Sequence, residues 1–241
     1  MTPTAARKWA AASAAGVLAL YASILRRRIQ WLGTSDEERT ATYPGDDLIP
    51  GGRRYGAMAT TIAAPPERVW PWLVQMGCDR AGFYSFDRLD NGGRPSADRI
   101  HEQWQNLREG DRIASAPDAS RWFDVALLVP EQVLVLRASL TVPTARNFDP
   151  AGGLPRAYSD STWGFFLQPT VDGHTRLVVT GKARGKPYAL IAGANWLLWD
   201  PAHWVMQLKQ FAGLRRRVEP LSDGAAGRSH ERAPDSEAVP A

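Results

Sequence analysis

One long helical pattern near the end of the chain follows a run of strand patterns, and this order restricts the possible folds. Its apolar stripe repeats at helical spacing and contains Trp204, Val205, Leu208, Phe211 and Ala212. The opposite side of the pattern is largely polar and contains Met206, Lys209, Gln210, Arg216 and Arg217. Asp200-Pro201 precedes the stripe and is typical of a helix start, because aspartate caps helices and proline suits the first turn. We therefore expect an α+β domain in which one curved antiparallel sheet wraps a long C-terminal helix.

Strand patterns occupy six segments before this helix. Runs of β-branched, aromatic and other apolar residues mark the segments 54–62, 112–114, 122–129, 133–140, 161–168 and 175–182. Residues 130–132 and Asp172-Gly173 suit hairpin connections. The stretch 141–161 is rich in Pro, Gly, Asn and Asp, which indicates a long loop. Such loops are uncommon in compact domains and are usually functional or disordered.

Two further helices are expected between the first and second strands. Pro65-Pro66 is a helix start, and the apolar stripe that follows contains Val69, Trp72, Leu73 and Met76. Pro71 should kink this helix and Gly77 should end it. A shorter helix is predicted for residues 96–105, which include Trp104.

The charge of the chain argues against nucleic acid as a partner. The formal net charge is +4, but residues 1–32 hold five basic residues and no acidic one, so the excess lies in that segment. No basic face is therefore implied for the body of the protein. Cys78 is the only cysteine, which excludes an internal disulfide and a cysteine metal cluster, and it reads as a small core residue.

The segment 9–25 contains no charged residue and is flanked by Arg7-Lys8 and by Arg26-Arg27-Arg28. As a helix it would be about 25 Å long, slightly short of a bilayer core, and flanking basic side chains can extend outward. We expect a single-pass membrane anchor here, with a surface helix as the alternative. The distribution of basic residues places the body of the protein on the cytoplasmic side.

These patterns divide the chain into four parts. Residues 1–28 are the predicted hydrophobic anchor helix, and residues 29–52 are a connecting arm in which Ser35 and Glu38 form a helix-start signal. Residues 53–219 form the folded domain. Residues 220–241 are rich in Pro, Gly, Ser and Ala, and we expect them to be a disordered tail.

Several stretches resemble a known superfamily. They are "WLGTSDEE" at 31–38, "ATTIAAPPERVWPWLVQMGCDRAGFYSFDRLDN" at 59–91, "ADRIHEQWQNLREGD", "STWGFFLQP", "HTRLVV" and "MQLKQFAGLRRRVE". Together they are similar to the START-like SRPBCC superfamily, also described as polyketide cyclase/dehydratase-like, and most of all to an uncharacterised bacterial branch of it. The resemblance implies a helix-grip fold with a deep apolar cavity beneath the C-terminal helix. It implies no single activity, because the superfamily includes lipid carriers, hormone receptors, cyclases and oxygenase domains.

The stretch 75–91 gathers polar groups where an apolar helix ends, which makes it a candidate site. The residues predicted to contact a ligand are Gln75, Arg80, Tyr84, Trp104 and Trp163. The candidates for acid–base catalysis are Tyr84, Asp87 and His101. The structural alternative is that Arg80 pairs with Asp87 and that Tyr84 bonds to backbone. No metal site or cofactor is expected, because the four histidines stand far apart and no paired cysteines occur.

The function that we expect from the sequence is the binding or transport of a hydrophobic or amphipathic small molecule, such as a lipid, in an apolar cavity of a membrane-tethered protein. The alternative is a cyclase or dehydratase that uses the acid–base set. The apolar connector 186–200 has two interpretations: it folds as core or extends the helix backward, or it is a hydrophobic lid.

Overall fold

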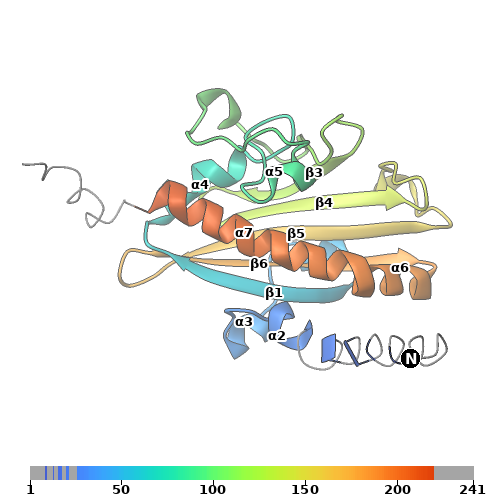
Figure 1. Ribbon diagram of the computed structural model, residues 1–241. Coiled ribbons are helices and arrows are strands. Elements are labelled where there is room, and N and C mark those ends of the chain that lie inside the picture. The colour runs from blue at the N-terminus through green and yellow to red at the C-terminus, as the bar shows by residue number, and fades with distance from the viewer. Residues whose placement is uncertain (1–8, 10–12, 14–15, 18–19, 22–25, 220–241) are drawn as a thin grey trace, which may run out of the picture.

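The computed structural model describes residues 9, 13, 16–17, 20–21 and 26–219. The elements in chain order (Figure 1) are α2 (Arg26–Gln30), α3 (Asp36–Thr40), η2 (Asp46–Leu48), β1 (Arg53–Ile62), α4 (Pro66–Val74), α5 (Asp87–Asp90), η3 (Glu102–Trp104), β2 (Arg112–Ala114), β3 (Trp122–Val129), β4 (Val133–Thr141), η4 (Pro150–Gly152), β5 (Tyr158–Pro169), β6 (Thr175–Lys186), α6 (Tyr188–Ala194), η5 (Asn195–Trp199) and α7 (Asp200–Val218).

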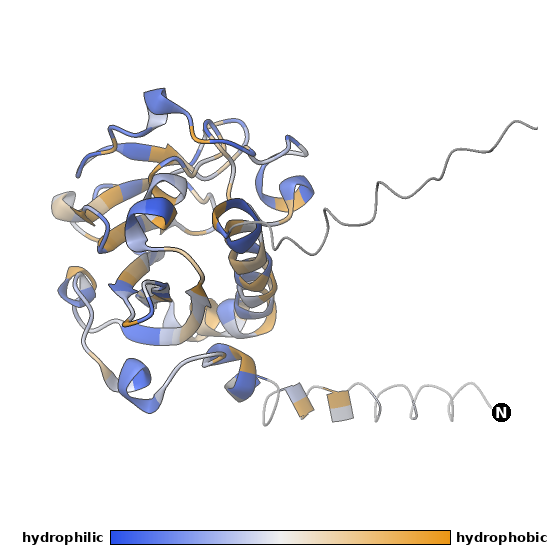
Figure 2. Ribbon diagram, turned by 90° about the vertical axis from the view of Figure 1, so that its left-hand side faces the viewer, coloured by the Kyte–Doolittle hydropathy of each residue, from blue (hydrophilic) through white to orange (hydrophobic). Residues whose placement is uncertain are grey.

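The six strands form one antiparallel sheet in the order β1-β6-β5-β4-β3-β2. Strands β2 to β6 follow one another as neighbours, whereas β1 joins the far edge by pairing with β6. Helix α7 crosses one face of the sheet (Figure 1), and Figure 2 shows it nearly end-on beside the strands. The predicted α+β class, with a curved antiparallel sheet and a long C-terminal helix, is confirmed, and this arrangement fits a helix grip.

The main core lies between the sheet and the helices α4 and α7. Strand residues alternate between the two faces of the sheet, so Phe165 enters this core while its neighbour Phe166 packs on the opposite face. Of the predicted stripe, Val69, Trp72 and Leu73 lie in helix α4, and Met76 lies just beyond its end; all four are buried in this core. Cys78 is buried here as predicted, and its Sγ donates to the carbonyl oxygen of Asp90 at 2.9 Å.

The arm that precedes β1 covers the other face of the sheet. Tyr43 packs against Phe166 with ring centroids 4.6 Å apart, and the guanidinium of Arg54 lies 4.9 Å from the Tyr43 ring centroid. The predicted helix start is confirmed, since Ser35 and Glu38 form a capping box at α3. Glu38 also pairs with Arg176 of β6 at 2.7 Å. The arm therefore belongs to the packed structure of the domain.

The predicted strands agree closely with the observed ones. β2 and β3 have the predicted bounds, and β1 begins one residue earlier than expected. β5 and β6 both extend toward the predicted long loop, where Tyr158 pairs with Lys186. Helix α4 ends at Val74, before the expected stop at Gly77.

The short helix predicted for 96–105 is wrong except for the single turn η3. Its first half is held by bonds from distant residues. The Ser96 N–H donates to Asp87 Oδ1 (3.0 Å) and the His101 N–H to Gln75 Oε1 (3.0 Å), while the Ala97 N–H donates to the Ala81 carbonyl (2.9 Å). The His101 N–H is therefore not available for a helical hydrogen bond to the Ala97 carbonyl, whereas the Ser96 and Ala97 bonds fix where the segment starts.

Among the described residues, no helix is long and apolar enough to cross a membrane. This finding overturns the prediction of a single-pass membrane protein with a cytoplasmic body. In the segment 1–28 the structure gives bounds only for the start of α2, so the hydrophobic anchor helix is not supported. Of the stretch 9–25, only Trp9, Ser13, Gly16, Val17, Leu20 and Tyr21 are described. The predicted tail, 220–241, lies outside the described residues.

Candidate functional site

Gln75 uses its whole amide to join α4 to the segment that follows α5. It is fully buried, and its Nε2 donates to Tyr84 Oη (3.0 Å) and to the Arg99 carbonyl (3.1 Å). Its Oε1 accepts from the His101 N–H. These bonds satisfy the buried amide, which would be costly to leave unpaired. In this structure Gln75 braces the fold.

Tyr84 is enclosed in the same way. Its Oη donates to the Trp72 carbonyl at 2.9 Å, and the Arg217 guanidinium covers its ring at 4.8 Å from the centroid. Burial raises the pKa of Tyr84 well above its ordinary value, although the hydrogen bond from Gln75 opposes the shift. The Tyr84 hydroxyl is therefore neutral and occupied.

Asp87 and His101 have structural partners as well. Asp87 Oδ1 accepts from Ser96 Oγ at 2.5 Å and from the Ser96 N–H at 3.0 Å. The His101 ring packs on Trp104, with centroids 4.5 Å apart. No ion pair between Arg80 and Asp87 is found within residues 26–219. The structure thus brings Gln75, Tyr84 and His101 together in one brace. That these residues bind or transform a ligand stays a prediction.

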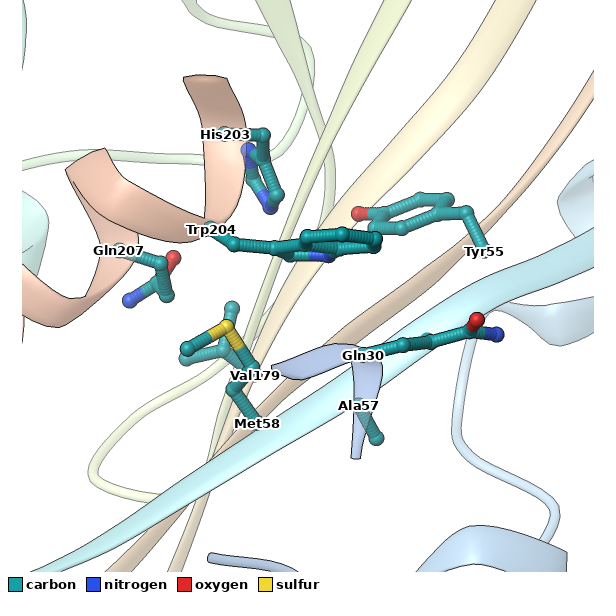
Figure 3. A pocket seen from close by; sticks show the side chains of 9 residues that line it. Gln30, Tyr55, Ala57, Met58, Val179, His203, Trp204 and Gln207 are labelled. Carbon is teal, nitrogen blue, oxygen red and sulfur yellow. The ribbon is translucent and has the colours of Figure 1, made fainter. Parts of the chain in front are cut away.

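A second set of residues surrounds a small cavity beneath the first turns of α7 (Figure 3). The lining residues are Gln30, Tyr55, Gly56, Ala57, Met58, Val179, His203, Trp204 and Gln207. They come from α2, β1, β6 and α7. The cavity volume is about 10 Å³, which is room for roughly one water molecule. We call it the His203 cavity.

His203 is the centre of an aromatic cluster. Its ring centroid lies 5.7 Å from that of Tyr55, 6.0 Å from that of Trp163 and 6.2 Å from that of Trp199. Burial lowers the pKa of His203 to about 4. Burial also raises the pKa of Tyr55, and the nearby carboxylate of Asp200 adds to the shift. Both side chains are uncharged at pH 7, so the lining of the His203 cavity carries no charge.

A chain of polar side chains runs along the inner face of α7. Trp163 Nε1 donates to Gln207 Oε1 (3.2 Å), and Gln207 Nε2 donates to Gln210 Oε1 (2.8 Å). Gln210 Nε2 then donates to the Phe83 carbonyl at 3.0 Å. Both glutamines are only 2% exposed. Trp163, which the sequence analysis predicted as a ligand contact, therefore lies beside His203 and apart from the Gln75 brace.

The side of α7 that faces the core differs from the predicted apolar stripe. Trp204 and Phe211 are buried as expected, but Val205 is 54% and Leu208 is 41% exposed, while the polar Gln210 faces the core. Gln207 and His203 were not among the predicted site residues, because the apolar stripe of a helix is normally the side that faces the core. The available signal was the polar pair Gln207 and Gln210 at helical spacing on the side of Trp204 and Phe211.

The connector before α7 is helical and exposes apolar side chains. It consists of α6 and the π-helix η5, neither of which contains a fully buried residue. The exposed apolar residues on this connector and on the first turns of α7 are Tyr188, Leu190, Leu197, Leu198, Trp199, Val205 and Leu208. The connector thus extends the helix backward, which was one of the two interpretations, and Asp200 is no N-cap. Instead, Asp200 Oδ2 accepts from Arg26 Nη2 at 2.8 Å.

Within the described residues, no group of three or more His, Cys, Asp or Glu side chains is arranged to hold a metal ion. Cys78 is not a candidate nucleophile either. Burial raises the pKa of its thiol to about 11, and the neighbouring Asp90 adds to the shift.

No protein-family model matches the chain, and the comparison with curated proteins gives no match. Among solved structures, a hypothetical protein from Helicobacter pylori is similar with a TM-score of 0.46 at 12% identity, covering 78% of this chain and 99% of that one. A protein from Nitrosospira multiformis has a TM-score of 0.43 at 14% identity, covering 69% and 96%.

A protein of the dynemicin biosynthetic locus is also similar, with a TM-score of 0.37 at 16% identity. The match covers 68% of this chain and 46% of that chain. Likeness at these scores assigns neither a family nor a function to the protein.

Proposed function

We propose that the protein binds a largely apolar or amphipathic small molecule beneath the first turns of α7, beside His203 and Gln207. One observation carries this proposal: α7 turns Gln207 and Gln210 into an apolar core while it exposes Val205 and Leu208. A helix selected only for stability would bury the apolar residues. Local choices that contradict the fold are expected mainly at functional sites.

The chemistry of the lining favours an uncharged ligand. Small-molecule sites are mostly apolar and contain a few polar groups that fix orientation. Here the polar groups include the amides of Gln207 and Gln30 and the neutral imidazole of His203. They also include the hydroxyl of Tyr55, which donates to the Thr162 carbonyl at 2.9 Å. An ionised group would lose its hydration among lining residues that carry no charge, and the nearby guanidinium of Arg26 is already paired with Asp200. Gln207 already bonds to Trp163 and Gln210, but its amide has a second N–H and a second lone pair on Oε1, which a ligand hydroxyl or carbonyl group could use.

Entry of such a ligand requires movement, because small-molecule sites typically occupy about 300–1,000 Å³. The element placed to move is the lid, which we define as residues 188–199 (α6 and η5). None of the residues of the lid is fully buried, so displacement of the lid would disrupt little of the core. Trp199 of the lid lies nearly parallel to the His203 ring, at an interplanar angle of 20°, and displacement of the lid would uncover that ring.

The test uses the full-length protein and Nile red, a neutral and mostly apolar fluorescent probe. We expect saturable binding of Nile red, displacement by 1-dodecanol, and much weaker displacement by dodecanoate, whose carboxylate is ionised at pH 8. Replacing Gln207 with Leu should weaken displacement by 1-dodecanol at least tenfold, since the alcohol loses its hydrogen-bond partner.

The control separates the interior from the exposed apolar surface. Val205→Ser and Leu208→Ser remove exposed apolar side chains of α7 that lie outside the lid and should leave Nile red binding unchanged. If these surface variants abolish binding, or if the wild-type protein binds no Nile red, the proposal is wrong.

The enzymatic alternative, a cyclase or dehydratase that uses Tyr84, Asp87 and His101, remains an untested prediction. The hydroxyl of Tyr84 and one oxygen of Asp87 are occupied by hydrogen bonds within the fold. Catalysis by this set would require those bonds to break. No described contact favours it over the binding function.

A further inference from the structure

An open groove of about 540 Å³ lies at the edge of the sheet away from the His203 cavity. It is lined by two loops, one between β2 and β3 and the other after β4. The lining residues are Ser120, Arg121, Trp122, Thr144, Ala145, Arg146 and Asn147. The groove has the volume of a small-molecule site without any movement of the chain.

Side-chain bonds hold the two loops in place. The side-chain amide of Asn147 bonds to the backbone of Trp122 as a neighbouring strand would. Its Oδ1 accepts from the Trp122 N–H (3.1 Å) and its Nδ2 donates to the Trp122 carbonyl (2.9 Å). Thr141 Oγ1 accepts from the Arg146 N–H (3.2 Å) and donates to the Arg146 carbonyl (3.0 Å). The loops are therefore built without the two arginine side chains of the groove.

The side chains of Arg121 and Arg146 are exposed, and neither guanidinium has a hydrogen bond or ion pair within residues 26–219. A third guanidinium, that of Arg112, lies 4.4 Å from the Trp122 ring centroid and 3.4 Å from Asp124 Oδ1. The other nearby acid, Asp118, accepts from Ser120 Oγ at 2.7 Å. Asp118 stays ionised, and its pKa is lowered mainly by hydrogen bonds from Ser120 and to a smaller extent by the charge of Arg121. The guanidinium N–H donors of Arg121 and Arg146 have no partner among the described residues and are therefore available to a ligand.

Both loops also hold a residue in a conformation that L-amino acids rarely adopt. Ala119 has φ of +54° and Ala145 has φ of +51°, although neither is glycine. Such strain persists only where the surrounding structure imposes it, and it is concentrated at functional sites. Here it occurs two residues before Arg121 and directly before Arg146.

We propose that this groove binds a small anionic molecule through a carboxylate or phosphate group held by Arg121 and Arg146. A guanidinium presents parallel N–H donors that match the two oxygens of such a group. The proposal is independent of the His203 cavity, because the two sets of lining residues share no member.

The experiment titrates the full-length protein at low salt with inorganic phosphate and, separately, with succinate. Binding is followed by calorimetry and by the NMR signal of the Trp122 indole N–H, which Trp122→Phe identifies. We expect saturable binding of at least one anion, and a loss of affinity of at least tenfold in the double variant Arg121→Ala/Arg146→Ala. Arg88→Ala removes an exposed positive charge from α5, and this variant should bind the anion as the wild type does.

The two probes distinguish the sources of the anionic group. Binding of phosphate alone indicates a phosphorylated ligand, and binding of succinate alone indicates a carboxylic acid. The melting temperature of the double variant should be unchanged, because both side chains are exposed and unpaired. Absence of saturable binding for both probes, or equal affinity in the double variant and the wild type, would overturn the proposal.

Discussion

Gly213 of α7 lies directly against the backbone of Tyr84, so that a methyl group at position 213 would overlap the Tyr84 carbonyl oxygen. Tyr84 has φ of +59°, an unusual value for a bulky residue. The missing side chain at Gly213 therefore allows α7 to approach the segment that carries Tyr84. The contact couples the C-terminal helix to the Gln75 brace.

We expect Gly213→Ala to lower the free energy of unfolding by about 1–3 kcal/mol, because the added methyl group overpacks a rigid contact. Urea denaturation measures the change. Gly193→Ala is the matched control, since position 193 also lies in a helix but has open space around it. That variant should be unchanged or more stable by up to about 1 kcal/mol, as alanine favours helix. Equal stability of both variants would show that α7 does not approach Tyr84 so closely.

Asp160 is fully buried at the centre of a charged network on β4, β5 and β6. Its carboxylate accepts from Arg137 Nε (2.9 Å), Arg184 Nε (3.0 Å) and Ser139 Oγ (3.0 Å). Burial alone would raise the pKa of Asp160, but the hydrogen bonds from the arginines and Ser139 outweigh it and hold the pKa below its ordinary value.

We therefore expect Asp160→Asn to lower the free energy of unfolding at pH 7 by about 3 kcal/mol, as breaking a buried ion pair does. The carboxylate stabilises the fold above the unfolded-state pKa of about 3.9, and this contribution is lost as the pH falls through the lower folded-state pKa. The difference between variant and wild type should thus shrink below pH 4. Denaturation curves from pH 7 to pH 3 test this, with the exposed Asp98→Asn as control.

Asp90 should respond in the opposite direction. Within the described chain both of its carboxylate oxygens are buried without a hydrogen-bond partner, and burial, with the neighbouring Asp87, raises its pKa to about 6. Protonation of Asp90 favours the folded state of the protein. This contribution to stability is complete below the unfolded-state pKa of about 3.9 and is lost as the pH rises through 6. Asp90→Asn should therefore stabilise the protein at pH 8 and have little effect at pH 4. Destabilisation at pH 8 would show that the carboxylate has a partner.

His203 should make the stability fall between pH 6.5 and pH 4. Its folded-state pKa of about 4 lies below the unfolded value of about 6.5, so in this window the unfolded chain binds more protons. His203→Gln should remove this part of the pH dependence. His174→Gln, at the β5–β6 turn, controls for the loss of a histidine. If both variants follow the wild-type profile, His203 is not held neutral by burial.

Tyr43→Ala should lower the free energy of unfolding by about 3 kcal/mol, since it removes a buried aromatic ring from the second core. Tyr188→Ala changes a tyrosine that is exposed and should stay within about 0.5 kcal/mol of the wild type. Thermal denaturation compares the two. A small effect at Tyr43 would mean that the arm is dispensable for folding.

The strands were predictable because their signal is local. In β3, Phe123 and Val125 face the main core while Trp122 and Asp124 alternate with them, and this pattern is visible in the sequence alone. The segment 96–105 was not predictable in this way. Its backbone conformation depends on Asp87 and Gln75, whose side chains reach it from other elements.

The candidate site was harder to predict for a similar reason. A dense polar stretch such as the one around Tyr84 indicates either a site or a brace, and only the geometry shows that these groups bond to one another. Gln207 and Gln210 are inconspicuous in the sequence, because the buried side of α7 differs from its most apolar side. Trp163 was identified from its residue type, but its neighbours were not.

The pairing of the first strand with the last has a consequence for how the chain folds. Strands β2 to β6 can associate by local hairpins, but Ile62 of β1 pairs with Thr175 of β6, so β1 cannot pair until β6 is in place. Contacts between segments so distant in sequence slow folding, because the chain loses loop entropy before the pairing can compensate. During synthesis β1 would leave the ribosome long before its partner. We infer that addition of β1 to the sheet, together with docking of α7, is a late step, and that a nascent chain ending before β6 leaves β1 exposed to chaperones.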